Sequence, residues 1–248
     1  MVAGPAAEDA ILRARRLPRL RVGLHLVLVE GRPVLPPRRL PDLVDTRGNF
    51  RSDMARLGLA IFARASVRRQ VAAEIEAQFK AYRASGLALD HVNAHKHFHL
   101  HPTVAEQTIA IGRNYGLRAL RVPLEPASVL AEVEPSARRR PAYLSAPWAA
   151  LLRRRARRAG LQTPEAVFGL AWSGAMTPSR LTGLLRRLPA GCTEIYLHPA
   201  MAGGFEGDAP GYRYADELAA LMAPSAIAAA RRADVALGGY SDFRTVTD

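Results

Sequence analysis

Apolar runs of strand length alternate with segments of helical periodicity along this 248-residue chain. The clearest run, residues 21–30, is almost continuously apolar and is interrupted by one histidine, His25. Such a run is typical of a strand that is buried on both faces, as in a parallel sheet. The alternation predicts an α/β fold with a parallel sheet, either open or closed into a barrel.

The predicted elements keep this rhythm through the chain. Strands are expected at 21–30, 87–100, 117–122, 192–198 and 235–241, and helices at 6–16, 67–85, 102–115, 177–188, 216–222 and 225–233. Thr177 followed by Pro178 is a favourable start for a helix. No glycine-rich phosphate motif follows a strand, which argues against a nucleotide-binding fold. We expect one domain over residues 1–248.

Composition limits the class of protein. Hydrophobic residues make up 49% of the chain, enough for a sizeable core. No uncharged run is long enough for a transmembrane helix, and the first residues lack the pattern of a signal peptide. Cys192 is the only cysteine, which fits a reducing compartment and favours the cytoplasm.

The net charge of +13 comes almost entirely from arginine, since Lys80 and Lys96 are the only lysines. A GC-rich genome accounts for this bias more simply than a function does, although an anionic partner is the alternative. The densest basic region, residues 138–158, interleaves Tyr143 and Trp148 with arginines, as an interfacial membrane helix does. A solvated helix face is the simpler interpretation. Nucleic acid is not expected as a partner, because no recognised binding motif is present.

All seven histidines fall within or at the ends of predicted strands: His25, His91, His95, His97, His99, His101 and His198. In parallel α/β folds the chemistry lies at the carboxyl ends of the strands, and imidazole is a common ligand of Zn²⁺ and similar metals. If the strand at 87–100 extends that far, alternation places the histidines from His95 to His101 on one face. At about 3.3 Å per residue, only the first one or two of them reach one metal.

Each histidine alone has a simpler interpretation, as a core residue or part of a surface tract that binds metals nonspecifically. Three separate strands that each place a histidine near an end favour a shared site.

At these histidines the sequence resembles the YdjC-like carbohydrate deacetylases, a family that includes bacterial chitooligosaccharide deacetylase. The matching blocks are residues 22–33, 89–102, 120–123, 197–200 and 238–243. They look closest to the hopanoid-biosynthesis-associated branch. The two blocks that contain His25 and His95 are specific, whereas the others would be weak alone.

The resemblance implies a distorted TIM-like (βα) barrel of the glycoside hydrolase and deacetylase type. It also implies a divalent metal, Mg²⁺ by family habit with Zn²⁺ as the alternative, bound by one Asp and two His. The two His positions fall on His25 and His95. His198 is the candidate general acid, His97 a substrate contact, and Arg121 a group for a sugar hydroxyl or the oxyanion.

One departure concerns the family's N-terminal Asn-Ala-Asp-Asp-Phe-Gly motif, which supplies the Asp ligand and the catalytic base and is absent from this sequence. The alignment implies that the first βα unit is lacking, and a misplaced start of the reading frame explains this better than true loss of a buried strand. Asp90 is a candidate substitute for the base. Asn93 stands where the family often has Asp. An unpaired strand edge at that place would allow a homodimer.

The implied reaction is removal of acetate from an N-acetylated amino sugar. The hopanoid branch narrows the substrate to an N-acetylglucosaminyl group on a polycyclic lipid, which implies peripheral contact with the inner membrane by a cytoplasmic protein. The alternative is a catalytically inactive paralogue that binds a sugar or lipid headgroup.

Overall fold

The computed structural model describes residues 1–136, 146–232 and 234–243. Internal contacts group them into two compact units. The first unit takes residues 1–121, 150–163 and 238–243, and the second takes residues 122–136, 146–149, 164–232 and 234–237. The prediction of one domain over residues 1–248 stays a prediction.

A parallel pair of strands forms the centre of the first unit. β1 (Val22–Leu26) pairs with β2 (Leu89–Ala94), and His25 lies opposite Asn93 in the register. Two single parallel bridges, from Val92 to Leu120 and from Ala119 to Gln162, continue the order beyond β2. The predicted parallel pairing is therefore confirmed in this unit, although the segment at 117–122 forms bridges rather than a strand.

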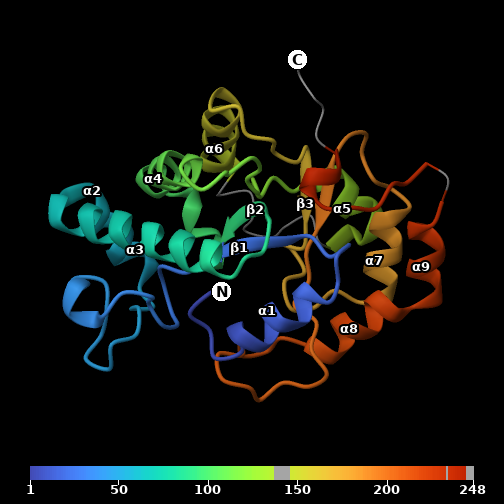
Figure 1. Cartoon of the computed structure of the whole chain (residues 1–248). Helices are drawn as coiled ribbons and strands as arrows, with labels where there is room; N and C mark the ends of the chain where they lie inside the picture. The colour runs from blue at the N-terminus through green and yellow to red at the C-terminus, as the bar shows by residue number, and fades with distance from the viewer. Residues whose placement is uncertain (137–145, 233, 244–248) are drawn as a thin grey trace. The chain divides into compact units, whose positions relative to one another are not determined.

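The first unit also contains α-helices, the last of which begins in the second unit. They are α1 (Ala7–Arg15), α2 (Met54–Ala63), α3 (Ala65–Ala84), α4 (Pro102–Arg113) and α6 (Ala146–Arg158). α3 packs against β1 and α4 (Figure 1) because Val67, Val71, Ile75 and Phe79 recur at helical spacing and are all buried. The helix stops before Gly86, whose φ of 72° is readily adopted only by glycine.

The second unit has its own parallel pair and core. β3 (Ala166–Phe168) pairs with β4 (Thr193–Ile195). Its helices are α5 (Ala127–Val133), α7 (Pro178–Leu185), α8 (Tyr214–Met222) and α9 (Pro224–Ala230). Phe168 and Trp172 lie at the centre of its core. The predicted start of α7 is confirmed, since Thr177 Oγ1 accepts a hydrogen bond from Arg180 N at 3.3 Å and Pro178 is the first helical residue.

Several boundaries differ from the sequence prediction. The strand predicted to reach residue 100 ends at Ala94 and is followed by a 3₁₀ segment, His95–Leu100. The strand predicted at 235–241 is wrong, because Tyr240–Phe243 forms a 3₁₀ turn. α2 and β3 were not predicted. The part of the basic region at 138–145, with Tyr143, lies outside the described residues. The α/β class is confirmed, and the distorted barrel stays a prediction.

Candidate functional site

His25 and His95 lie together at the carboxyl ends of the neighbouring strands β1 and β2. His25 is the penultimate residue of β1, and His95 directly follows β2. Their ring centroids are 5.8 Å apart, with an angle of 72° between the planes. The parallel pairing brings them together, as their positions in the sequence predicted.

A row of polar side chains on β2 connects His25 to a buried carboxylate. His25 Nδ1 lies 2.6 Å from Asn93 Oδ1. Asn93 Nδ2 lies 3.4 Å from His91 Nε2, and His91 Nδ1 lies 2.9 Å from Asp90 Oδ2. Burial lowers the pKa of His25 to about 3, although the hydrogen bond with Asn93 opposes this shift. His25 is therefore a neutral imidazole near neutral pH, the form that can bind a metal.

Asp90 is poorly suited to act as the substitute base that the sequence suggested. Its buried carboxylate accepts hydrogen bonds from Tyr240 N at 3.1 Å, Ser241 N at 2.9 Å and Ser241 Oγ at 2.7 Å, in addition to the contact with His91. Burial alone would raise the pKa of Asp90, but these donors outweigh burial and hold it well below its usual range. A carboxylate with such a low pKa is a weak proton acceptor.

Backbone strain is concentrated beside the two histidines. Among the described residues, the non-glycine residues with positive φ are Glu30 at 50°, Lys96 at 50° and His97 at 54°. The Glu30 carboxylate forms an ion pair with Lys96 and lies 3.6 Å from His95 Nε2. Left-handed conformations in residues other than glycine cost energy and often occur at functional sites. Glu30 was not among the predicted site residues, and its position at the end of the apolar run 21–30 was the available signal.

The turn at Lys96 and His97 corrects the predicted row of histidines. Because the chain leaves the strand after Ala94, the histidines from His95 to His101 do not alternate along one strand face. His99 is buried, with Nε2 2.8 Å from the Arg121 carbonyl oxygen. His101 caps α4 by accepting a hydrogen bond from Thr103 N at 3.3 Å. These last two histidines therefore have structural roles.

The remaining predicted site residue of the first unit, Arg121, is also buried. Its backbone N–H donates to the Val92 carbonyl oxygen at 2.9 Å, which fixes it beside β2. Its positive charge is near enough to contribute to the lowered pKa of His25.

The donor set around His25 and His95 fits a divalent metal in part. Two imidazoles are suitable ligands for Zn²⁺ and related ions. No group of three or more His, Cys, Asp and Glu side chains that could hold a metal is found in the described part of the chain. The described residues thus contain the two histidines of the predicted set, and their role as ligands stays a prediction.

His198 lies in the second unit, after β4, and is held by a buried carboxylate. Glu217, which is 1% exposed, accepts hydrogen bonds from His198 N at 2.5 Å and from Met176 N at 3.0 Å. Its Oε2 lies 3.7 Å from His198 Nδ1. Burial alone would raise the pKa of Glu217, but its bonds with His198 and Met176 outweigh burial and lower it. Glu217 lies three residues from both Tyr214 and Ala220, on the buried face of α8. An acidic residue at this helical spacing from apolar residues was the available sequence signal for a buried partner of His198.

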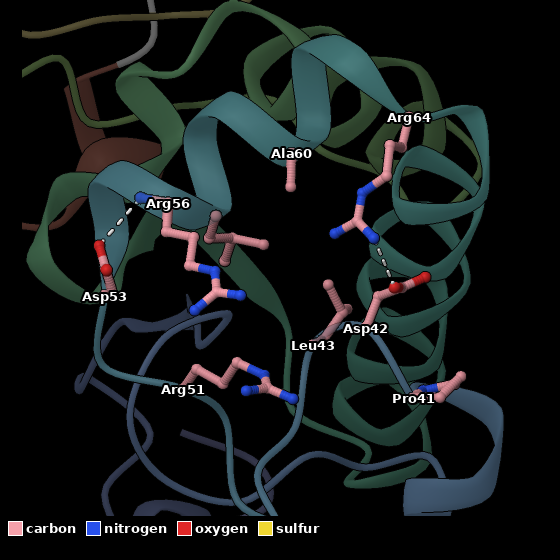
Figure 2. Close-up of a pocket in the computed structure, with 9 residues that line it drawn as sticks. Pro41, Asp42, Leu43, Arg51, Asp53, Arg56, Ala60 and Arg64 are labelled. Carbon is pink, nitrogen blue, oxygen red and sulfur yellow. Dashed lines mark hydrogen bonds and ion pairs between the residues drawn. The ribbon is translucent and has the colours of Figure 1, made fainter.

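A separate pocket of about 160 Å³ lies beside α2 in the first unit. Arg51, Arg56 and Arg64 reach toward it (Figure 2), and the buried side chains of Leu43 and Leu57 also line it. Arg64 Nη1 donates to Asp42 Oδ1 at 3.0 Å. Asp53 is occupied as the cap of α2, where its Oδ1 accepts a hydrogen bond from Arg56 N at 2.9 Å.

None of the described helices combines the length and the apolar character that are needed to cross a membrane.

Comparisons with known proteins place this geometry in a family context. The model of the YdjC-like protein family matches residues 1–232. A carbohydrate deacetylase of Geobacillus stearothermophilus is 28% identical over 244 residues, which cover 96% of this chain and 82% of the relative. A carbohydrate deacetylase of Mus musculus is 33% identical over 221 residues, with coverage of 80% and 67%.

A solved structure shares the fold. It is an Enterococcus faecalis protein described as a cellobiose-phosphate cleavage protein, with a TM-score of 0.72 and 22% identity. The similarity covers 99% of this chain and 86% of that chain.

Proposed function

Because the chain belongs to the YdjC-like protein family, we propose that it is a hydrolase that removes an acetyl group from an acetylated amino sugar. The names of the relatives as carbohydrate deacetylases support this proposal. The observation that connects this activity to particular residues is the pair of His25 and His95. Their ring centroids lie 5.8 Å apart at the carboxyl ends of neighbouring strands.

The finer proposal is that this pair holds a divalent metal, with Mg²⁺ favoured by the family resemblance and Zn²⁺ as the alternative. Such a metal, when bound, activates a water molecule and polarises the acetyl carbonyl group. His25 suits a ligand role because its lowered pKa keeps the ring neutral. We assign neither a third ligand nor a general base among the described residues.

The other predicted residues would act on the sugar and the leaving group. The buried guanidinium of Arg121 would hold a sugar hydroxyl or stabilise the developing oxyanion, and His97 would contact the substrate. His198 would protonate the leaving amine. The Glu217 carboxylate, 3.7 Å from His198 Nδ1, would stabilise the imidazolium form from which that proton is given.

Acetate release from N-acetylglucosamine oligomers tests the proposal. We expect His25→Ala and His95→Ala each to lower turnover at least about a hundredfold and to reduce bound metal measured by elemental analysis. His101→Asn is the matched control, since the Asn side-chain oxygen can still accept the hydrogen bond that caps α4, and it should retain turnover. Full activity in both alanine variants contradicts the proposal. Sugar binding without acetate release from the unmodified chain would indicate the non-catalytic paralogue instead.

We further propose a lipid-linked substrate, an N-acetylglucosaminyl hopanoid, which is the substrate implied by the resemblance to the hopanoid branch. α6 supports peripheral membrane contact, because it carries the exposed Trp148 and a run of arginines. Arg157 donates to Thr163 Oγ1 at 3.1 Å and is therefore a poor choice for the test. Arg153→Ser with Arg154→Ser should weaken co-sedimentation with anionic liposomes, whereas the same changes at residues 38 and 39 should have less effect. Equal sedimentation of both double variants contradicts membrane contact through α6.

A further inference from the structure

We propose that Asp90, His91 and Asn93 form a directional hydrogen-bond chain that holds His25 with its proton on Nδ1 and leaves the Nε2 lone pair available to a ligand. These three are positioning residues that act through His25. The use of the lone pair by a metal rests on the proposed function, whereas the position of the proton does not.

The direction of the chain begins at Asp90. An ionised carboxylate only accepts hydrogen bonds, and the neighbours of Asp90 include the backbone N–H groups of Tyr240 and Ser241. His91 Nδ1, 2.9 Å from Asp90 Oδ2, must therefore carry a proton. In the neutral ring, His91 Nε2 is then an acceptor.

The next two contacts follow from this direction. The Asn93 group that faces His91 Nε2 at 3.4 Å must donate, so it is the amide nitrogen. The Asn93 oxygen then faces His25 Nδ1 at 2.6 Å and requires a proton there. The orientation of the Asn93 amide is thus fixed by the carboxylate at the end of the chain, independently of how the amide atoms are assigned.

An amide suits position 93 better than a carboxylate would. Asn93 accepts from His25 with one atom and donates to His91 with the other. An aspartate could accept from His25 but could not donate to His91.

Close packing around His91 and Asp90 restricts the movement of the hydrogen-bonded side chains. A Cβ atom at Gly23 would lie 2.6 Å from His91 Cε1, and one at Gly239 would lie 2.8 Å from Asp90 Oδ1. The His91 ring also packs against Tyr240, with ring centroids 4.7 Å apart. Gly23 and Gly239 therefore provide the space that the side chains of His91 and Asp90 occupy.

The position of the proton can be read directly. Long-range ¹H–¹⁵N NMR of the metal-free protein, labelled with ¹⁵N-histidine, reports which ring nitrogen is protonated. We expect His25 as a single Nδ1-protonated form. His91→Phe keeps the ring packing but removes both nitrogens, so it should give a mixture of tautomers. The control His101→Phe should not change His25. A wild-type His25 protonated on Nε2, or no change in His91→Phe, overturns the proposal.

Variants at position 93 and metal affinity give independent readouts. Asn93→Asp keeps the acceptor and should preserve the tautomer, whereas Asn93→Leu should lose it. With Zn²⁺ alone as the probe, we expect Asn93→Leu, which removes the hydrogen-bond partner of His25, to weaken binding roughly 10- to 100-fold. No Zn²⁺ binding with an Nδ1-protonated His25 would refute the metal in the proposed function and leave the chain of bonds supported. Zn²⁺ binding with an Nε2-protonated His25 in the metal-free protein would refute the chain of bonds alone.

The geometry of the pocket beside α2 points to a second site, one that binds a phosphate group. Figure 2 shows the side chains of Arg51 and Arg56, both of which line this pocket. Within residues 1–136, 146–232 and 234–243, no hydrogen bond or ion pair occupies either side chain, whereas Arg64 is held by Asp42. Asp42 and Asp53 also line the pocket, but Asp42 is paired with Arg64 and Asp53 caps α2. The guanidiniums of Arg51 and Arg56 are therefore suited to a doubly charged oxyanion.

The backbone of the pocket is fixed before a ligand arrives. Arg51 N donates to the Leu43 carbonyl oxygen at 3.1 Å, and the Arg51 carbonyl oxygen accepts from Glu30 N at 3.3 Å. A volume of about 160 Å³ is equivalent to roughly five water molecules at 30 Å³ each, enough for a phosphate group with some water. The group can belong to a soluble phosphate monoester or to a lipid.

Calorimetric titration with inorganic phosphate at constant ionic strength tests this site. We expect saturable binding that Arg51→Gln with Arg56→Gln weakens at least tenfold and Arg38→Gln with Arg39→Gln leaves unchanged. The control pair removes the same charge from an exposed turn outside the pocket. Equal weakening in both pairs, or no saturable binding, overturns the proposal. With the site present, competition by glucose 6-phosphate identifies a soluble source, and competition only by phosphatidic acid vesicles identifies a lipid.

Discussion

Gly23 lies where β1 passes the ring of His91, and a methyl group at this position has no room. Its Cβ would be 2.6 Å from Cε1 and 2.7 Å from Nε2 of His91. Gly23→Ala must displace either the ring or the strand. We expect it to lower the free energy of unfolding by about 1–3 kcal/mol, measured by urea denaturation, which is typical of overpacking.

Gly58 provides the matched control for this substitution. It lies inside α2, and a Cβ there would make an ordinary contact of 3.6 Å with His101 Cδ2. Because alanine favours a helix more than glycine does, Gly58→Ala should raise the free energy of unfolding by up to about 1 kcal/mol. A Gly23→Ala variant as stable as the unmodified protein would show that the His91 ring is not confined as described.

Asp90 links this packing to pH. Burial alone would raise its pKa, but the donors from His91, Ser241 and Tyr240 hold the pKa well below its usual range. A depressed acid pKa stabilises the fold above the unfolded value of about 3.9, and this stabilisation is lost as the pH falls below that value. Asp90→Asn should therefore destabilise the protein most near pH 7 and progressively less below about pH 4. Unfolding measured from pH 3 to pH 7 checks this, and a constant difference between the proteins would contradict it.

At the scale of elements, α3 holds the segment that follows β1 by means of two polar residues on its buried face. Gln78 Oε1 accepts from Val27 N at 3.0 Å, and Gln78 Nε2 donates to the Val27 carbonyl oxygen at 2.6 Å. Glu74 accepts from Val34 N at 2.8 Å and from Leu35 N at 3.0 Å. The segment between these contacts carries Glu30, so α3 also positions a neighbour of His95.

Replacing Gln78 by Leu would leave two buried backbone groups of Val27 without their partners. Each such group costs about 1–3 kcal/mol, so we expect a loss of about 2–6 kcal/mol in the free energy of unfolding. Lys80→Ala, on the exposed face of the same helix, should change it by less than about 0.5 kcal/mol. Thermal or urea unfolding of both variants makes the comparison. Equal stability of the two would mean that the clamp on Val27 contributes nothing.

The same helix shows how far the sequence predicts the elements. The helix predicted at 67–85 and the start of α7 depend on local spacing and capping, and both were predicted correctly. The end of β2 was not, because it depends on positive φ at Lys96 and His97, which the sequence does not signal. β3 has three residues, too few for a periodic pattern to identify.

The candidate site divides in the same way. The meeting of His25 and His95 was predictable, because parallel strands bring their carboxyl ends together. The bond from Asp90 to Ser241 joins residues 151 positions apart and depends on the tertiary fold. The partners that fix the protonation of a site are therefore harder to predict than its ligands.

At the scale of the whole molecule, Glu125 is the carboxylate on which part of the second unit depends. It accepts hydrogen bonds from Gly169 N at 2.9 Å, Leu170 N at 3.0 Å and Ala171 N at 2.9 Å. Burial raises its pKa, although these three donors oppose the shift. Glu125→Ala removes the acceptor of all three, so a loss of at least about 2 kcal/mol is expected. Glu132→Ala, which breaks only an exposed ion pair with Arg187, should have little effect.

This variant also tests the prediction that residues 1–248 form one domain. In a single cooperative domain, the most slowly exchanging amides open only when the whole chain unfolds. A loss of 2 kcal/mol caused in the second unit must then accelerate these amides about thirtyfold in both units. Native-state hydrogen exchange of Glu125→Ala measures the acceleration of amide exchange in each unit separately. Acceleration confined to the second unit would mean that its parallel pair and helices unfold independently, because stability lost there would not reach the strands that carry His25 and Asn93.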